Sequence, residues 1–325
     1  MYHAIGLDLG GSSAKVALVA ASGAVLAKEQ VPIPGQADPE AVLAPIGAAV
    51  DRLRADAVRR GLAPVAVGCG FSGYLDATGA RIELNNTPAL NGFAIEPWLR
   101  ARFGLPVVLE NDACAAAMAE TWRLIEMRGR RVLFVTVGSG IGVVLVVDGA
   151  IVRVMKGVTG DASHLIVQRG SRERCPAGCH GCLETVASAR AIARAGEQAA
   201  RDGSSPFLAR LLAEHGTISS LDVSRAAGMG DVGARDVLAR AGEWLGLGLA
   251  SWACAYAPDL ILLGGGVAQA ADPWLDSAIS AMRQAGVPLH VEALAVERAT
   301  LGNQAGVIGA AVLALHAAGY IVTAR

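Results

Sequence analysis

The sequence lacks any apolar run long enough to cross a bilayer. Its first residues, MYHAIGLDLGG, contain no basic segment that leads into an apolar one. We therefore expect a cytoplasmic protein with no membrane partner. No charge of one sign dominates either, because 28 lysines and arginines stand against 29 aspartates and glutamates. This balance argues against nucleic acid or a membrane surface as a partner, since both attract proteins with an excess of basic residues.

Cysteine is also scarce, and six in 325 residues are too few for a disulfide framework. Cys69, Cys114 and Cys254 each stand alone among apolar residues, so we expect all three to be small buried core side chains. The other three lie within ten residues, in the segment CPAGCHGCLE at 175–184. The purpose of this segment is the main question that the sequence raises.

Strand-like and helix-like patterns alternate along the chain, which predicts an α/β protein. The chain exceeds the length at which one core usually stops growing, so we expect two lobes. An internal repeat supports two lobes: residues 4–31 and 132–157 both read as strand, glycine turn, strand, turn, strand. In the second copy, Asp148-Gly149 predicts a tight hairpin, because both residues tolerate a positive φ angle.

The glycine turns of the two copies, Gly10-Gly11-Ser12-Ser13 and Gly138-Ser139-Gly140-Ile141-Gly142, suggest phosphate sites. Loops without bulky side chains let backbone N–H groups approach an anion. Either turn alone is better explained as a simple hairpin, and neither contains the Gly-Lys-Ser/Thr of a P-loop. Two turns at equivalent places in two lobes could hold a triphosphate across a cleft. A third cluster, Gly264 to Gly266 after a buried strand, fits either a site or close helix–strand packing.

A carboxylate for catalysis is found in LPVVLEND at 105–112, where a strand-like run meets an alanine-rich helix former. Asn111 or Asp112 could simply be the helix N-cap. A carboxylate at a strand end beside a phosphate site is also suited to act as the general base of phosphoryl transfer to an alcohol.

The segments that carry a family resemblance run through the whole chain: DLGGSSAK (8–15), GFSGYLD (70–76), NTPALNGF (86–93), FGLPVVLENDACAAAMAE (103–120), VTVGSGIG (135–142), GDASH (160–164), GCLETVAS (181–188), YAPDLILLGGGV (256–267) and LGNQAGVIGAA (301–311). Together they resemble the ROK family of sugar kinases and repressors, within the actin-like ATPase superfamily. The END segment and the cysteine cluster are the most specific of them.

The resemblance implies two ribonuclease-H-like lobes around a central cleft, a small one of residues 1–112 plus 305–325 and a large one of residues 113–304. It implies an ATP-dependent sugar kinase, with Asp112 as the general base and Asp8 positioning Mg²⁺. The ATP-binding residues it implies are Asp8, Gly10, Gly11, Ser12, Lys15, Gly138, Ser139, Gly140, Gly265 and Gly266. The sugar-binding residues it implies are Asn111, Asp112, Asp161, His164 and Glu184. A homodimer is expected as well, as is common in the family.

The family pattern also implies a structural Zn²⁺, held by a histidine and by cysteines in the order Cys-x-Cys-Gly-x-x-Gly-Cys-x-Glu. Aligned on the shared GCLE, this chain has Ala177 where the second cysteine belongs, and alanine cannot bind a metal. Cys179 stands two positions later, so we predict the ligands His164, Cys175, Cys179 and Cys182. His180 is the weaker alternative to Cys179.

Further departures surround the expected sugar pocket: Asp161 replaces a glutamate, Ser163 a glycine and Ser72 a proline. They leave the phosphate side unchanged, so we predict a kinase for glucose or a related hexose whose preference can differ from that of a plain glucokinase. An N-acetylmannosamine or N-acetylglucosamine kinase and a fructokinase are the alternatives. A non-catalytic sugar sensor stays open. A repressor is disfavoured, because only seven residues precede Asp8 and leave no room for a helix-turn-helix.

Overall fold

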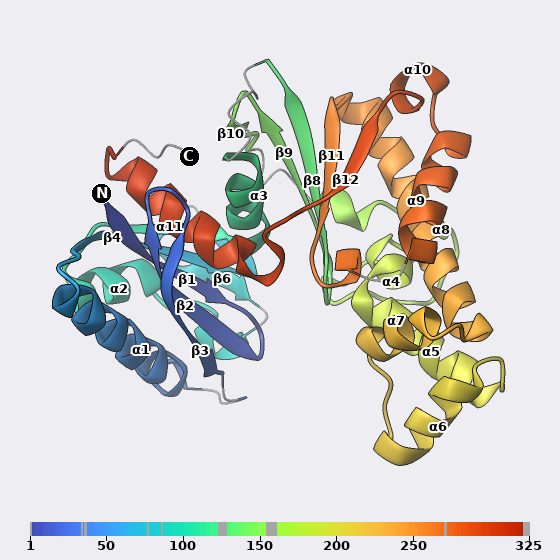
Figure 1. Cartoon of the computed structure of the whole chain (residues 1–325), viewed down its shortest axis with the longest axis horizontal. Helices are drawn as coiled ribbons and strands as arrows, with labels where there is room; N and C mark the ends of the chain where they lie inside the picture. Colours follow the sequence, from blue (N-terminus) through green and yellow to red (C-terminus); the bar gives the residue numbers. More distant parts are fainter. Residues whose placement is uncertain are drawn as a thin grey trace. The chain divides into compact units, whose positions relative to one another are not determined.

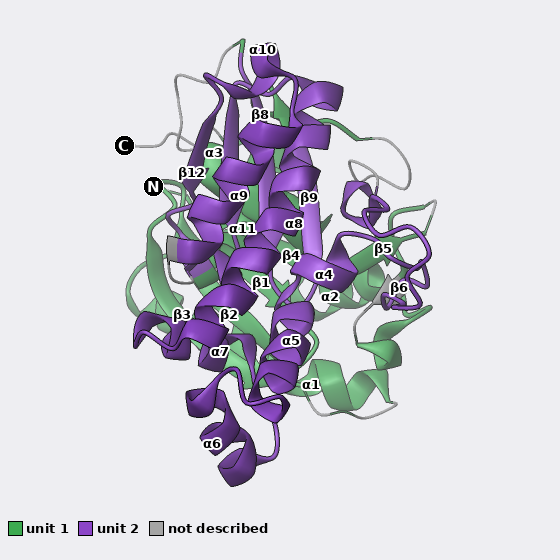
Figure 2. Cartoon of the chain, turned by 90° about the vertical axis from the view of Figure 1, so that its right-hand side faces the viewer, with its two compact units in different colours: residues 1–129, 146–160, 303–325 green, residues 130–145, 161–302 purple. Residues whose placement is uncertain are grey.

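The computed structural model describes residues 2–33, 35, 38–76, 78–85, 87–122, 129–153, 161–269 and 272–320. The chain divides into two compact units, shown in green and purple in Figure 2. The first comprises residues 1–129, 146–160 and 303–325, and the second comprises 130–145 and 161–302. Strands and helices occur in both units, which confirms the predicted α/β class. The predicted division into lobes of residues 1–112 plus 305–325 and of residues 113–304 stays a prediction.

The first unit is built on a five-stranded sheet with the order β3-β2-β1-β4-β7 (Figure 1). β1, β2 and β3 form an antiparallel meander, whereas β4 and β7 run parallel to β1. The strands span His3–Leu9 (β1), Ser13–Ala20 (β2), Val25–Pro32 (β3), Pro64–Phe71 (β4) and Val107–Asn111 (β7). Since parallel strands end at a common edge, the last residues of β1, β4 and β7 lie side by side there.

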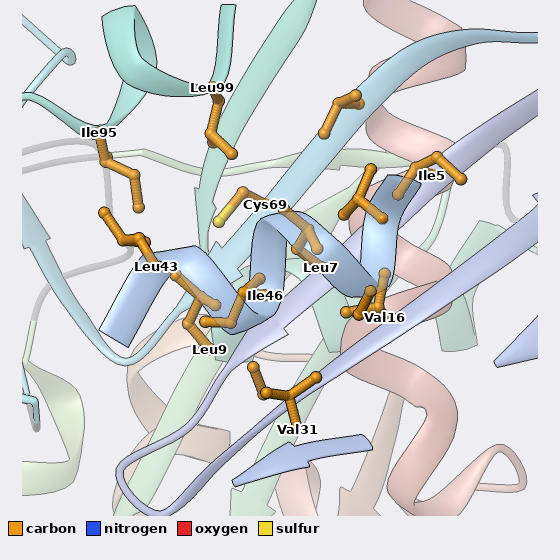
Figure 3. Packing of buried hydrophobic residues seen from close by; sticks show 14 of the residues in the cluster. Ile5, Leu7, Leu9, Val16, Val31, Leu43, Ile46, Cys69, Ile95 and Leu99 are labelled. Carbon is orange, nitrogen blue, oxygen red and sulfur yellow. The ribbon is translucent and has the colours of Figure 1, made fainter. Parts of the chain in front are cut away.

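One face of this sheet is apolar and packs against α1 (Pro39–Arg59) and α2 (Ile95–Phe103). Figure 3 shows Leu7, Leu9 and Cys69 of the strands packed with Leu43 and Ile46 of α1, and all five side chains are at most 1% exposed. Alternate residues of a strand point to opposite faces, which is why the odd-numbered residues of β1 fill this core. Cys69 and Cys114 are buried, as predicted.

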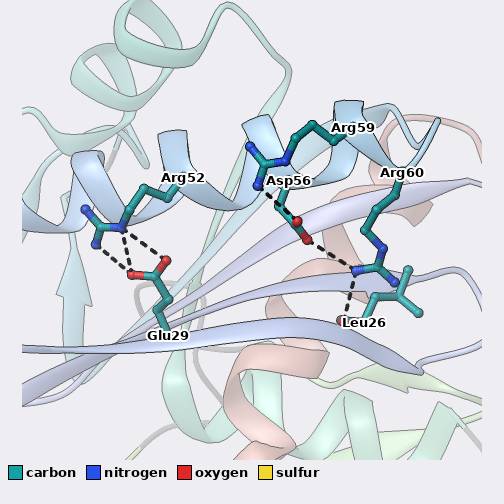
Figure 4. Close-up of polar contacts among 6 residues, drawn as sticks. All are labelled: Leu26, Glu29, Arg52, Asp56, Arg59 and Arg60. Carbon is teal, nitrogen blue, oxygen red and sulfur yellow. Dashed lines mark hydrogen bonds and ion pairs between the residues drawn. The ribbon is translucent and has the colours of Figure 1, made fainter.

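An N-terminal cap starts helix α1, and two arginines hold the helix to the sheet. The Asp38 side chain accepts a hydrogen bond from the Glu40 backbone N–H, and Pro39 occupies the first helical position, where its missing N–H is not needed. Arg52 pairs with Glu29 of β3 at 2.6 Å, and Arg60 donates to the Leu26 carbonyl at 3.2 Å (Figure 4). These contacts hold the exposed side of the helix to the sheet edge.

The other face of the sheet is covered by α11 (Ala305–Ala317) and α3 (Asp112–Trp122), and here backbone meets backbone. A Cβ atom at Gly6 would lie 2.0 Å from the Val307 carbonyl oxygen, and one at Gly68 would lie 1.8 Å from that of Ala310. No side chain fits at these two positions, so glycine is what allows the C-terminal helix to rest directly on β1 and β4.

The second sheet repeats the plan of the first, with the order β10-β9-β8-β11-β12. Its strands span Arg131–Val137 (β8), Ile141–Val147 (β9), Ala150–Ile151 (β10), Leu260–Gly264 (β11) and Ala295–Arg298 (β12). In both sheets three successive strands form one side, and two strands that pair in parallel complete the other. Asp148 and Gly149 have φ angles of 53° and 76°, so the predicted hairpin turn is confirmed. The predicted repeat is therefore present up to residue 153, and residues 154–157 of its second copy lie outside the described residues.

The remaining short elements are β5 (Gly73–Leu75), β6 (Ile82–Asn85), η1 (Pro88–Leu90), η3 (Ala162–His164), η4 (Val267–Gln269) and η5 (Gly302–Gln304). The remaining helices are α4 (Glu184–Ala187), α5 (Ala189–Arg201), α6 (Pro206–His215), α7 (Ser220–Gly228), α8 (Val232–Tyr256), α9 (Asp272–Ala285) and α10 (Pro288–Val291). Cys254 on α8 is exposed, which corrects the prediction that it is a core residue. Its neighbours Trp252 and Ala253 occupy the buried side of the helix instead. Among the described residues, no helix has the length and hydrophobicity to cross a membrane.

Candidate active site

Asn111 and Asp112 lie where β7 passes into α3, and the structure separates their roles. The Asn111 side-chain oxygen accepts hydrogen bonds from the backbone N–H groups of Ala113 (3.0 Å) and Cys114 (3.2 Å), so it caps the helix. Its amide nitrogen donates to the Gly73 carbonyl at 3.2 Å. Asp112 is the first helical residue, and its carboxylate also accepts from Ala113 N–H at 2.8 Å. The capping is thus done mainly by Asn111, which accepts hydrogen bonds from two backbone N–H groups, whereas Asp112 accepts one.

The environment of Asp112 suits a general base. Burial, together with the negative charge of Asp8, raises the pKa of its carboxyl to about 6, against smaller opposing effects from the Ala113 N–H and the Ser72 side chain. A carboxyl with this pKa is largely ionised at neutral pH, yet it is far more basic than an ordinary aspartate. It can therefore accept a proton from an alcohol that is losing one.

Four residues in register across the sheet form what we call the cross-strand row: Lys15 on β2, Asp8 on β1, Gly70 on β4 and Glu110 on β7. Paired residues of neighbouring strands point to the same face, so the three charged side chains share one side of the sheet. Lys15 Nζ lies 3.0 Å from Asp8 Oδ2. A Cβ atom at Gly70 would lie 3.8 Å from the Asp112 Cα, so Asp112 starts its helix directly above this row.

The charge of Glu110 is balanced by Arg153, a residue that the sequence did not single out. The two side chains pair through both guanidinium Nη atoms, and the Nη1–Oε1 distance is 3.1 Å. Glu110 Oε1 also accepts from Asn111 N–H at 2.9 Å. The Arg153 pKa is raised mainly by its hydrogen bonds to Glu110. This ion pair therefore supports the backbone that presents Asn111 and Asp112.

The first predicted phosphate loop is a tight turn with accessible backbone. Gly10 N–H donates to the Ser13 carbonyl at 3.1 Å, and the Thr87 hydroxyl donates to the Gly10 carbonyl at 3.3 Å. Gly11 and Ser12 are exposed at its tip. The turn lies at the end of β1, two residues beyond Asp8.

The second predicted loop, 138–140, is braced within the second unit. The Gly138 carbonyl accepts from Ala189 N–H at 2.8 Å, and the Ser139 carbonyl accepts from Arg190 Nε at 2.6 Å. Glu184, which the sequence places at the sugar, accepts from Ile141 N–H at 3.0 Å. Its carboxylate lies 2.5 Å from where a Cβ of Gly140 would be, so a side chain at position 140 would displace the Glu184 carboxylate from this place.

Gly265 and Gly266, which the family resemblance implies at the ATP, differ in their surroundings. Gly265 has a φ angle of 85°, and a Cβ atom there would lie 2.4 Å from the Val137 carbonyl oxygen. Gly266 has no atom within 4 Å of such a Cβ position. The sequence left two alternatives for this cluster, a binding site or close packing. Gly265 is closely packed, whereas the space beside Gly266 is open.

His164, Cys175, Cys179 and Cys182 come together in one cluster, with their ligand atoms all within 4.8 Å of one another. The His164 Nδ1 atom lies 3.6, 3.5 and 3.6 Å from the three sulfur atoms in that order. A tetrahedral Zn²⁺ with ordinary bond lengths separates nitrogen from sulfur by about 3.5 Å, and sulfur from sulfur by about 3.8 Å. Cys175 and Cys179 are somewhat closer, at 3.2 Å. The set of four donors is compatible with structural zinc.

A turn explains how Cys179 reaches the place left by Ala177. Gly178 N–H donates to the Cys175 carbonyl and Cys175 N–H donates to the Cys179 carbonyl, both at 2.9 Å. Gly178 has a φ angle of 102°, which favours glycine, and the turn brings Cys179 back beside Cys175. His180 is exposed, and its Nδ1 lies 3.3 Å from the Arg172 carbonyl, away from the cluster.

The predicted sugar loop is only partly described, because Gly160 of the GDASH segment lies outside the described residues. Asp161 is exposed, and its carbonyl accepts from His164 N–H at 2.9 Å. Ser163 is buried. The structure thus ties the Asp161 backbone to the histidine of the cysteine cluster.

Known proteins resemble this chain over nearly its whole length. The chain is 33% identical to a glucokinase of Streptomyces coelicolor over 95% of this chain and 96% of that protein. It is 28% identical to an N-acetylmannosamine kinase of Escherichia coli over 95% and 97% of the two chains. A ROK family glucokinase of Streptomyces griseus, solved in complex with glucose and AMPPNP, superimposes with a TM-score of 0.83 at 30% identity, covering 97% of this chain and 99% of that one. This likeness confirms the predicted actin-like ATPase fold. Since the sequence profile of the ROK family also matches residues 4–317, the chain belongs to the ROK family.

Proposed function

We propose that the chain is an ATP-dependent kinase that transfers the γ-phosphoryl group of ATP to a hydroxyl group of glucose or a related hexose. The observation that carries this proposal is Asp112, a half-buried carboxyl with a pKa raised to about 6, at the same sheet edge as the glycine turn that follows β1. Kinase relatives that match nearly the whole chain support the same reaction.

The proposed chemistry is a single displacement. The sugar oxygen forms a bond to the γ-phosphorus, the bond from that phosphorus to the bridging oxygen breaks, and ADP leaves. The sugar hydroxyl gives its proton to Asp112, and Asn111 holds the sugar through its amide. Backbone N–H groups of Gly11 and Ser12 and of Ser139 and Gly140 would receive the phosphates. Gly10 and Gly138, whose N–H groups donate to carbonyls of their own turns, would shape the two loops. Glu184 and His164 would hold sugar hydroxyls.

Mg²⁺ and Zn²⁺ both fit residues that are present. Asp8 offers a hard oxygen ligand, one of whose oxygens is free of the Lys15 contact, and Mg²⁺ there would neutralise phosphate charge. The four donors of the cysteine cluster match a closed zinc site, which supplies folding energy and no open coordination position. Zinc would hold the chain between His164 and Glu184 in place.

Glucose is the proposed acceptor, since the Streptomyces relatives are glucokinases. An N-acetylhexosamine, with N-acetylmannosamine first, is the second candidate. The relative of that name and the exposed, shortened Asp161 favour it. Fructose has only the family resemblance in its favour. The predicted homodimer and the cytoplasmic location stay predictions.

The test is a coupled ADP-release assay with ATP, Mg²⁺ and a panel of glucose, mannose, fructose, N-acetylmannosamine and N-acetylglucosamine. The same panel run on Asp112→Asn is the control, because this variant keeps the shape of the site but cannot take a proton. Turnover that is lost in Asp112→Asn supports the proposal. A wild-type protein that binds a sugar and transfers no phosphoryl group to it would identify a sensor instead.

A further inference from the structure

The cross-strand row contains a lysine whose position points to a second role. Resting on the proposed function, we propose that Lys15 is a positioning residue: through its ion pair with Asp8 it keeps the Asp112 carboxyl ionised at neutral pH and therefore able to accept a proton. Contact with a phosphate, the role that the family resemblance implies, does not require this pair.

The geometry places Lys15 on Asp8 by the register of the sheet. The two residues are direct partners on β1 and β2, and the ammonium nitrogen lies 3.0 Å from the carboxylate. The Asp8 side chain is 15% exposed and that of Lys15 is 34% exposed, so the pair is only partly screened by water. On its other side Asp8 meets the first turn of α11, where a Cβ at Gly306 would touch the carboxylate at 3.0 Å.

The next position of the row is Gly70, so no side chain stands between Asp8 and the start of α3. Asp112 lies directly above this glycine, and the Asp8 charge acts on Asp112 and on the buried Cys69 thiol, raising the pKa of both. An unbalanced carboxylate at this distance favours the protonated form of Asp112. A protonated Asp112 has no base function.

The other described groups around Asp112 do not offset the negative charge of Asp8, so that role falls to Lys15. On β7, Glu110 has its own cation in Arg153. On α3, Cys114 is a buried thiol whose pKa is raised by burial, so it stays neutral. The first turn of α11 has no charged side chain, and Ser72 beyond β4 contributes a side-chain hydrogen bond. Within the described part of the chain, Lys15 is the cation paired with Asp8.

The contribution of the Lys15–Asp8 ion pair to folding stability does not explain why the pair lies at this site. A partly exposed ion pair contributes only about 0–1 kcal/mol to folding. Without the lysine, the full Asp8 charge would act on the neighbouring Asp112 carboxyl, in a site where the effective dielectric constant is far below that of water. The pair is therefore better placed to set a protonation state than to hold the sheet together.

The test compares Lys15→Met with Lys28→Met, which removes the same charge from an exposed position on β3 of the same sheet. Protein with ¹³C-labelled aspartate carboxyls, free of nucleotide and metal, is titrated by NMR, and Asp112→Asn assigns the signal. We expect the Asp112 midpoint to rise by about 0.5–1 pH unit in Lys15→Met. It should not move in Lys28→Met, and it should return to the wild-type value in Lys15→Arg.

A second readout is the pH dependence of kcat/KM for the sugar, whose acid limb should rise by the same amount. A midpoint that does not move in Lys15→Met, with only the KM for ATP raised, overturns the proposal and leaves Lys15 a phosphate contact. An equal shift of the Asp112 midpoint in Lys28→Met overturns the proposal too, since loss of any lysine charge on this sheet would then have the same effect. The NMR titration needs no turnover, so it tests the ion pair even if the proposed kinase reaction is wrong.

Discussion

Loss of one member of the Glu110–Arg153 pair should cost far more than loss of the other. The Glu110 side chain is 8% exposed, whereas that of Arg153 is 42% exposed. Arg153→Met leaves a nearly buried carboxylate that, among the described residues, keeps the hydrogen bond from the Asn111 N–H. Removing the partner of a buried charge costs about 3–5 kcal/mol, and the exposure of Arg153 reduces this to about 2–3 kcal/mol.

Glu110→Gln should cost about 1 kcal/mol, because the freed guanidinium can turn to water and glutamine still accepts from Asn111 N–H. The double variant should match Glu110→Gln alone. Urea unfolding at pH 7.5, followed by circular dichroism, measures all three free energies. The exposed pair Arg52–Glu29 is the matched control, and Arg52→Met should cost at most about 1 kcal/mol. Equal losses for the two single variants, or a larger one for Glu110→Gln, would refute the burial argument.

Three further predictions follow from the described contacts. Asp112→Asn should abolish turnover and be more stable than wild type by up to about 3 kcal/mol at pH 8, with no difference below about pH 4. The sign follows because a carboxyl whose pKa is raised to about 6 on folding loses its stabilising contribution as the pH rises through that value. Cys179→Ser should lower the zinc content per chain in elemental analysis, whereas Cys254→Ser, on the exposed side of α8, should not; equal zinc in both would contradict the ligand set. Gly68→Ala should lower the Tm by about 4–9 °C, because the overlap with the backbone of α11 costs about 3 kcal/mol, whereas Gly228→Ala, at an open helix position, should leave it within about 2 °C.

Local patterns allowed correct predictions where the physics is local. Asp148-Gly149 tolerates two positive φ angles, so the turn could be predicted from two residues. A glycine turn follows the first strand in both copies of the repeat, so the repeat could be predicted from the sequence. The spacing of Cys179 and Cys182 suggested half of a metal site, and the structure brings these two residues together with His164.

Other features depend on residues that only the fold brings together. Glu110 and Arg153 are 43 positions apart, and no local pattern links them. Lys15 and Asp8 are close in sequence, but their contact depends on the exact register of β1 with β2. Cys254 was mispredicted because its neighbours are apolar, whereas the rotation of α8 decides which of them are buried.

The seating of α11 on Gly6 and Gly68 has a consequence for synthesis of the protein. The strands that form this groove are made first, and the helix that fills it is encoded about 240–300 residues later. The groove is complete once β4 has been made, and α11 follows about 240 residues later. At about 5–20 residues per second, the ribosome therefore delivers α11 roughly 12–48 seconds after the groove is complete. During that time the small-residue face of β1 and β4 has no permanent cover. The first unit can therefore reach its final state only after α11 has left the ribosome, and until then this face of β1 and β4 is open to other contacts.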